Sequence, residues 1–339
     1  MANSFDALIP QNVAMPDDRR IGVYNARGNR VGFIPLGGLT FSQEGKKLYS
    51  FGALSDVHYQ YDTAPEDFHR ALTYLNETED VAFTCICGDL TSGGTAAELT
   101  AYKNAVDAYS PDTPVYAIMG NHDVRANLMD SIQNYTGHPN YYSIQHGNDV
   151  FIFVGNVADW TTDVLSTAEL QWLYETLEAN RNKRCFLFEH IRPTEGCGNA
   201  LGLYQRSTTD WGGTCGTVFE SLLTHYKNII FFHGHSHLRF YLQEFDELAN
   251  YDRIRGTHSV HVPSIAVPRD SDWAVDPSTT DAYAESEGYV VDVYPNGIHI
   301  RGRDFVKGEF LPIASYWLDT TLQTVEAGTY TDSTGTITT

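Results

Sequence analysis

The sequence repeats one arrangement five times: an apolar, β-rich run that ends in side chains able to bind a metal ion. Helical patterns separate several of these runs, as in "PEDFHRALTYLNETED", where Phe68, Leu72 and Leu75 fall at helical spacing. Alternating strands and helices predict an α/β fold. In an open α/β sheet the carboxyl ends of the strands form a ligand-binding edge, so we expect the five endings to converge there.

The five endings are "LSDVH", "ICGDL", "MGNHD", "FEH" and "HGHSH". They present seven candidate metal ligands: Asp56, His58, Asp89, Asn121, His190, His235 and His237. Residues two apart at a strand end can point to the same side and reach one ion, as in the Asp-x-His and His-x-His pairs. The set offers nitrogen and oxygen but no thiolate. We therefore expect divalent or trivalent transition-metal ions such as Mn, Fe, Zn, Co or Ni.

Seven ligands exceed the need of a single ion. Two ions that share a carboxylate would use all seven, and Asp89, alone at its strand end, is the natural shared residue. A pair of ions about 3.5 to 4 Å apart activates a water and clamps a phosphoryl group for in-line displacement. The pattern therefore favours a phosphoester hydrolase.

In order and spacing, "DVH", "GD", "GNHD", "H" and "GHSH" resemble the signature blocks of the calcineurin-like metallophosphoesterases, over residues 56 to 237. The resemblance implies a four-layer α/β/β/α sandwich, here with extra β segments at both termini. It also implies hydrolysis of a phosphoester by in-line attack of a metal-bridging hydroxide. Within the family, "GNHD" and the block spacing are more similar to the bacterial cyclic-nucleotide-phosphodiesterase-like branch than to the serine/threonine protein phosphatases.

The resemblance further implies how the metal ligands are divided. One ion would be held by Asp56, His58 and His237, the other by Asn121, His190 and His235, with Asp89 bridging them.

The same resemblance gives catalytic roles to the residues after Asn121. His122 would contact the phosphoryl group and protonate the leaving oxygen as a general acid. Asp123 would orient the His122 imidazole through a carboxylate to histidine hydrogen bond. Gly120 would let the backbone turn tightly enough to bring these residues to the ions.

The charge of the chain restricts its partners. With 22 Lys and Arg against 43 Asp and Glu, the formal net charge is −21, which argues against duplex nucleic acid and anionic membranes. We expect a small phosphoester substrate, such as a nucleotide. The sequence does not indicate an oligomeric state.

The amino terminus and the cysteines favour a cytoplasmic protein. No charged segment followed by an apolar core is visible at the start, and no apolar run reaches about 18 residues. Five cysteines are an odd number, as suits a reducing compartment. Cys197 and Cys215 could pair across a Gly/Thr-rich loop, but we expect free thiols.

The domain organisation follows from the β-rich termini. Residues 1–45 are expected to form an appendage with a hairpin in "IGVYNARGNRVGFIPL", residues 46–305 the catalytic domain, and residues 306–339 a carboxyl-terminal extension. "GYVVDVYPNGIHIRGRDF" predicts a hairpin around Pro-Asn-Gly. Two other functions stay open: a scaffold without catalysis, and a catalytic module of a cell-surface or phage-associated assembly.

Six further residues lie near the blocks. For Arg125 and Arg192, a salt bridge is favoured over a phosphate contact. Tyr59, Tyr61 and Trp211 could line the pocket. His233 either supports a metal ligand or packs in the core.

Overall fold

The structure is a computed structural model. It describes residues 46–60, 63–158, 164–193, 197, 213–244, 250–254, 256–269 and 285–320, and the backbone of short strands at 12–14, 20–24, 30–35, 40–42, 329–332 and 335–338.

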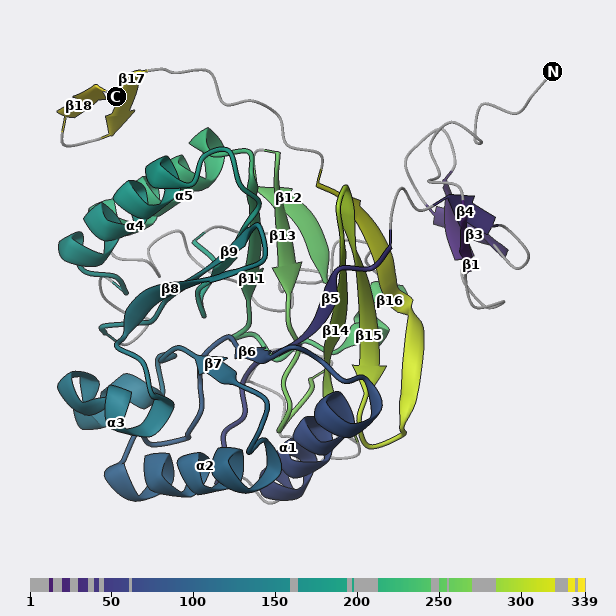
Figure 1. Cartoon of the computed structure of the whole chain (residues 1–339), viewed down its shortest axis with the longest axis horizontal. Helices are drawn as coiled ribbons and strands as arrows, with labels where there is room; N and C mark the ends of the chain where they lie inside the picture. The colour runs from purple at the N-terminus through teal and green to yellow at the C-terminus, as the bar shows by residue number, and fades with distance from the viewer. Residues whose placement is uncertain are drawn as a thin grey trace.

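Two six-stranded sheets form the centre of the molecule (Figure 1). The first has the order β12-β13-β11-β10-β9-β8. Its strands are β8 (Tyr141–His146), β9 (Asp149–Val154), β10 (Cys185–Phe188), β11 (Ile229–His233), β12 (Tyr251–Ile254) and β13 (Thr257–His261). The four inner strands are parallel and the two edge strands antiparallel to them.

The second sheet has the order β16-β15-β14-β5-β6-β7. Its strands are β5 (Tyr49–Leu54), β6 (Thr84–Ile86), β7 (Val115–Ala117), β14 (Glu287–Tyr294), β15 (Gly297–Asp304) and β16 (Glu309–Asp319). β5, β6 and β7 are parallel, whereas β14, β15 and β16 form an antiparallel meander. The hairpin predicted around Pro-Asn-Gly is confirmed, since Tyr294 pairs with Gly297.

Helices cover the outer faces of both sheets (Figure 1). Beside the second sheet lie α1 (Ala64–Thr73), which continues as the π-helical turn η1 (Tyr74–Thr78), α2 (Ala96–Tyr109) and α3 (Gln133–Thr136). Beside the first lie α4 (Thr167–Ala179) and α5 (Gly213–His225). Ser166 and Glu169 form a capping box at the start of α4.

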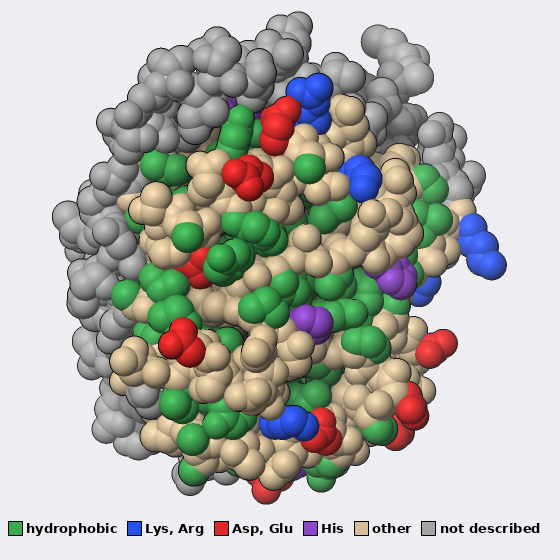
Figure 2. Space-filling model, turned by 60° about the vertical axis from the view of Figure 1, so that its left-hand side comes forward, with side chains coloured by type: hydrophobic (Ala, Val, Ile, Leu, Met, Phe, Trp, Pro, Cys, Tyr) green, Lys and Arg blue, Asp and Glu red, His purple; other side chains and the backbone are tan. Residues whose placement is uncertain are grey.

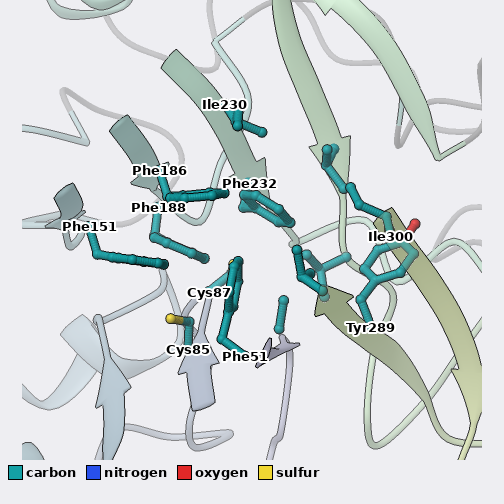
Figure 3. Packing of buried hydrophobic residues seen from close by; sticks show 14 of the residues in the cluster. Phe51, Cys85, Cys87, Phe151, Phe186, Phe188, Ile230, Phe232, Tyr289 and Ile300 are labelled. Carbon is teal, nitrogen blue, oxygen red and sulfur yellow. The ribbon is translucent and has the colours of Figure 1, made fainter. Parts of the chain in front are cut away.

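Residues alternate between two hydrophobic layers along each inner strand. In β10, Phe186 and Phe188 enter the layer between the sheets, where Phe51 and Phe151 meet them (Figure 3). The intervening Leu187 belongs to the layer beneath α4 and α5. Phe151 and Phe186 stack with ring centroids 4.6 Å apart. This alternation produces the α/β/β/α sandwich that the sequence predicts.

The terminal segments also contain strands. β2 (Arg20–Tyr24) and β3 (Arg30–Pro35) pair antiparallel, which confirms the predicted amino-terminal hairpin. The other short pairs are β1 (Asn12–Ala14) with β4 (Thr40–Ser42), and β17 (Thr329–Asp332) with β18 (Gly335–Thr338). The part of the expected carboxyl-terminal extension that forms β16 belongs to the second sheet.

Two further properties concern the helices and the cysteines of the described residues. None of the helices described combines the length and the apolar character that a membrane span needs. All five cysteines are buried and none forms a disulfide, which confirms the expectation that Cys197 and Cys215 do not pair.

Candidate metal centre

The candidate ligands follow the carboxyl ends of five parallel strands, three in one sheet and two in the other. Asp56 and His58 follow β5, Asp89 follows β6, and Asn121 follows β7. His190 follows β10, and the last two, His235 and His237, follow β11. All seven are buried. Both sheets therefore supply the site, and it lies where their ends meet.

The backbone is left-handed at most of these positions. Of the seven described residues other than glycine with positive φ, five are candidate ligands: Asp56, His58, Asp89, His235 and His237, with φ between 39° and 74°. A left-handed residue of this kind costs about 1–2 kcal/mol relative to right-handed backbone. Strain of this kind persists where the surrounding structure fixes it, and it concentrates at functional sites.

Two glycines are needed for the close approach of the strand ends. A Cβ at Gly120 would lie 2.2 Å from Asp89 Oδ1, and one at Gly234 would lie 1.8 Å from Ser55 Oγ and 2.5 Å from Asp56 Oδ2. Gly120 was expected to serve a tight turn, but its φ is not in the left-handed region. Its role is to let the β7 loop contact Asp89.

The side chains form two groups within reach of a single ion each. Asp56, His58, Asp89 and His237 make one group, and Asp89, His190 and His235 make the other. In each group the possible ligand atoms lie within 4.8 Å of one another. Asn121 lies beside the second group, with Oδ1 2.8 Å from His235 Nδ1. Asp89 is common to both groups.

In each of the two buried carboxylates, one oxygen accepts hydrogen bonds from the loops and the other lies beside an imidazole. Asp56 Oδ2 accepts from Ser55 Oγ at 2.6 Å and from the His235 amide at 2.9 Å, while Oδ1 lies 3.0 Å from His237 Nε2. Asp89 Oδ1 accepts from the His122 amide at 2.8 Å, while Oδ2 lies 3.2 Å from His190 Nε2. One oxygen of each thus fixes the loops and the other faces the ligand groups.

Hydrogen bonds to backbone carbonyls orient two of the imidazoles. His190 Nδ1 donates to the Cys87 carbonyl at 2.6 Å, and His237 Nδ1 donates to the Val267 carbonyl at 3.1 Å. In the neutral rings this leaves Nε2 as the nitrogen with a lone pair, the form that binds metal. The Nε2 atoms of His58 and His237 lie only 3.1 Å apart. A cation would stabilise these two facing nitrogens.

The electrostatics of the two ligand groups also favour positive charge. Burial raises the pKa of Asp56, but His237 and His190 beside it more than offset this and keep it below its ordinary value. Burial lowers the pKa of His190, but Asp89 and Asp56 raise it to about 10. The two buried carboxylates thus favour positive charge beside them, which metal ions would supply. The donor set, its burial and its charge fit two transition-metal ions.

The two expected catalytic residues are placed differently. His122 is partly exposed, and its ring lies edge-on to His58 with centroids 4.7 Å apart. Its Nδ1 donates to the Ser92 carbonyl at 2.8 Å. His122 thus lies at the rim of the ligand groups, where a substrate can reach it.

Asp123 does not orient His122, and this part of the sequence interpretation is wrong. Its oxygens accept hydrogen bonds from the amides of Gly120, Leu90 and Thr91 at 2.9 to 3.0 Å, and from Thr91 Oγ1 at 2.7 Å. Within the described residues it makes no hydrogen bond to His122. Burial and the charge of Asp89 raise its pKa to about 6 although these donors lower it. Asp123 instead connects the loop that carries Asp89 to the loop that carries Asn121.

The structure confirms some expectations for the residues near the five strand endings and corrects others. Arg192 pairs with Asp252 at 2.5 and 2.7 Å, so the favoured salt bridge is confirmed. Arg125 has no such pair among the described residues; its guanidinium contacts His122 and Ser92 O instead, which corrects the same expectation. Tyr59 donates to or accepts from His69 Nε2 at 2.9 Å.

Three of the six residues near the blocks remain. His233 Nε2 lies 3.3 Å from Cys197 Sγ. Tyr61 and Trp211 lie outside the described residues.

The sequence interpretation missed the loop after β13. Ser264 Oγ donates to the Asp56 carbonyl at 2.9 Å and accepts from the Val267 amide at 2.9 Å. His261, at the end of β13, lies 2.8 Å from Oγ of Ser236, the residue between the ligands His235 and His237. "HSVHVPS" is a sixth β-rich run with a polar ending, so the rule used for the other five could have found it.

Comparison with known proteins agrees with this geometry. The sequence model of the family described as calcineurin-like phosphoesterase matches residues 49–276. No curated protein matches the chain.

Solved structures are similar in fold. GAP50, the anchor in the inner membrane complex of Plasmodium, is 14% identical with a TM-score of 0.51, over 82% of this chain and 90% of that one. A conserved uncharacterised protein and predicted phosphoesterase from Streptococcus pneumoniae is 12% identical with a TM-score of 0.36, over 80% and 97%. The NAD nucleotidase NadN of Haemophilus influenzae is 12% identical with a TM-score of 0.42, over 85% and 52%.

Proposed function

The chain belongs to the calcineurin-like phosphoesterase family, and we propose that it hydrolyses a small phosphoester with the help of two transition-metal ions. The observation that carries the proposal is the pair of buried ligand groups that share Asp89. A carboxylate common to two groups is what a two-metal site needs, because one residue must contact both ions.

The ligands would be divided as the geometry groups them. Asp56, His58 and His237 would hold one ion, and His190, His235 and the amide oxygen of Asn121 the other, with Asp89 between them. Two cations there would supply a water of lowered pKa and positive charge for a phosphoryl group. The metals are Mn, Fe, Zn, Co or Ni, since the ligands are imidazole nitrogen and carboxylate or amide oxygen.

His122 would act on the leaving oxygen. Its Nδ1–H is engaged by the Ser92 carbonyl, so Nε2 is the nitrogen that can hold a proton toward the substrate. The ring lies against His58 at the rim, so Nε2 is close to the ligand groups without being one of their members. A proton given to the leaving alkoxide at this place would complete in-line hydrolysis.

Asp123 and Ser264 would serve the site indirectly. Asp123 joins the loops of Asp89 and Asn121, and Ser264 holds the backbone of Asp56. Both keep ligands in left-handed backbone conformations that would relax without support. Their contribution would be the position of the ligands rather than chemistry.

The charge distribution supports a small substrate. On the face shown in Figure 2, Lys and Arg side chains lie apart from one another and among acidic ones, with no continuous basic patch. Together with the net charge of −21, this disfavours duplex nucleic acid and anionic membranes as partners. A nucleotide or another small phosphoester fits better.

A scaffold without catalysis is the second candidate, since GAP50, similar in fold, is named an anchor. A protein that only binds a partner has no need of the buried ligands and strained backbone found here. The complete ligand set therefore favours hydrolysis.

The direct test is hydrolysis by the full chain after chelation and reloading with one metal at a time. We expect p-nitrophenyl phosphate or bis-p-nitrophenyl phosphate to be cleaved with at least one metal, and neither after chelation. If two metals bind and both esters stay intact under every metal, the chain is not a phosphoesterase of this type, and the scaffold function is favoured.

The role of His122 has its own test. His122→Ala should keep both metals and lose about 10² to 10⁴ in turnover, the usual contribution of a general acid. His225→Ala, on the last turn of α5, is the matched control and should keep both metals and turnover. Full turnover in metal-loaded His122→Ala would exclude the acid role.

A further inference from the structure

Arg125 is an exposed arginine at the rim of the ligand groups. It lies in the short 3-10 turn η2 (Asp123–Ala126), three residues after His122. Its Nη2 lies 3.1 Å from His122 Nε2, and its Nη1 lies 3.2 Å from the Ser92 carbonyl. The guanidinium thus covers the residue that faces the leaving group.

The contacts of Arg125 leave most of its donors unused. Its Nη1 also lies 2.7 Å from His122 Nδ1, but a ring that carries a proton on both nitrogens, as the acid role requires, can accept from neither Nη1 nor Nη2. One donor then goes to the Ser92 carbonyl, and an arginine has five N–H groups. The remaining donors belong to an exposed side chain.

Arg125 lacks the carboxylate partner that most other arginines of the described residues have. Arg70, Arg181, Arg184, Arg192, Arg239 and Arg301 each pair with a carboxylate. Among the described residues, no Asp or Glu pairs with Arg125. A positive charge placed at a site mouth without an anion is available to an anionic ligand.

We propose that Arg125 binds the outward oxygens of the substrate phosphoryl group and selects phosphomonoesters over phosphodiesters. The proposal rests on the proposed function and names its substrate class. A monoester phosphoryl group carries three acceptor oxygens and a charge of about −1.5 to −2 at pH 7. Its oxygens match the planar fork of a guanidinium, which binds phosphate through two parallel hydrogen bonds.

A diester offers less to the same residue. One of its oxygens carries a second ester group, so it has fewer free acceptor oxygens and a smaller charge. The ligand groups are buried, whereas Arg125 is exposed, so the guanidinium meets the part of the phosphoryl group that points out of the site. The second ester substituent of a diester would have to extend in that direction, out of the site. The guanidinium would then gain little from binding.

The test compares two esters and one product. The metal-loaded full chain, Arg125→Ala and Arg125→Lys are assayed with p-nitrophenyl phosphate and bis-p-nitrophenyl phosphate, and inorganic phosphate binding is measured by calorimetry. Arg125→Ala should lower kcat/KM for the monoester about 10- to 100-fold, mainly through KM, because it removes hydrogen bonds to a charged group. The diester should change less than about threefold, and phosphate affinity should fall with the monoester. Arg125→Lys should lie between, since it keeps the charge without the fork.

Arg253→Ala is the matched control. Arg253 is also exposed and lies on β12, where it pairs with His258 near the start of β13. This is the opposite end of the sheet from the site. It should leave both esters, phosphate affinity and metal content unchanged.

The outcomes separate the two proposals. Equal loss for both esters, or unchanged phosphate affinity in Arg125→Ala, would overturn the role of Arg125. If the wild type cleaves neither ester, the proposed function fails, and phosphate affinity still decides the binding role of Arg125, because it requires no turnover.

Discussion

The two ends of the parallel strands bury polar groups in opposite ways. At the amino ends, Asp149 at the start of β9 meets Arg184, just before β10, through hydrogen bonds of 2.9 and 2.7 Å. Tyr49 at the start of β5 donates to the same carboxylate at 2.6 Å, and Arg184 also donates to Tyr294 O and Thr320 Oγ1. At the carboxyl ends, imidazole nitrogens and carboxylate oxygens face one another.

The difference shows what each end is for. At the amino ends opposite charges and donors are matched, and none of these three strand-start residues has a left-handed backbone. At the carboxyl ends five residues are left-handed, and two Nε2 atoms lie 3.1 Å apart. A polar cluster whose donors and acceptors are matched stabilises the fold, whereas one in which lone-pair atoms of imidazoles and carboxylates converge is built for a ligand.

The largest effect should come from Asp89→Asn at the carboxyl ends. The amide keeps the size of the side chain but removes the charge common to both groups, so metal binding should be lost. Because bound metals supply several kcal/mol of transition-state stabilisation, turnover should fall at least about 10³-fold. Metal content and hydrolysis of the aryl phosphates measure this. Two metals retained with full turnover would remove Asp89 from the account.

The same carboxylate-to-amide change at the amino ends should act on stability instead. Asp149→Asn leaves Arg184 buried without its counter-charge, which typically costs about 3–5 kcal/mol. Denaturant unfolding should show the loss, while metal content and turnover per folded molecule stay as in the wild type. If Asp149→Asn lost metal and kept its stability, the contrast between the two ends would be broken.

Asp123→Ala should combine both kinds of effect at an intermediate size. Four donors lose their acceptor, so the free energy of unfolding should fall by about 2–3 kcal/mol. Metal affinity should fall about 10- to 100-fold. With saturating metal, turnover should recover to near the wild-type value. If turnover stayed as low as in His122→Ala with unchanged metal affinity, Asp123 would act on the acid after all.

The smallest effect should come from Ser236→Ala, between the last two ligands. Its hydroxyl contacts His261 at 2.8 Å, a single neutral hydrogen bond worth about 1 kcal/mol. We expect metal affinity to fall by no more than about tenfold, as measured by competition with a metal chelator. Ser221→Ala, which removes a similar hydroxyl from α5, is the control and should leave metal affinity unchanged.

The sequence predicted the parts of the fold and site that depend on local pattern. A β-rich run followed by Asp56, or by His235, is visible in the chain itself, and α/β topology then implies a common edge. The β-rich runs were less informative about the lengths of the strands. "PVYAIM" reads as one strand, yet β7 ends at Ala117, although Ile118 and Met119 beyond it stay buried.

What the sequence did not reveal are partners that lie far apart along the chain. Asp123 follows His122 directly, so it was paired with its neighbour, but its acceptor oxygens meet amides more than 30 residues away. Asp149 and Arg184 meet only because β9 and β10 are adjacent in the sheet. Neither contact has a local signal, since both depend on how the loops and strands pack.

The central claim is that these strand ends hold two cations through one shared carboxylate, and metal stoichiometry tests it most directly. The full chain, loaded with Mn²⁺ or Zn²⁺ and freed of excess, should contain two metals per chain. His190→Ala, which removes a ligand from one group only, should retain about one, and Asp89→Asn, which removes the charge common to both groups, should retain none. A single metal in the wild type, or two in His190→Ala, would contradict the account.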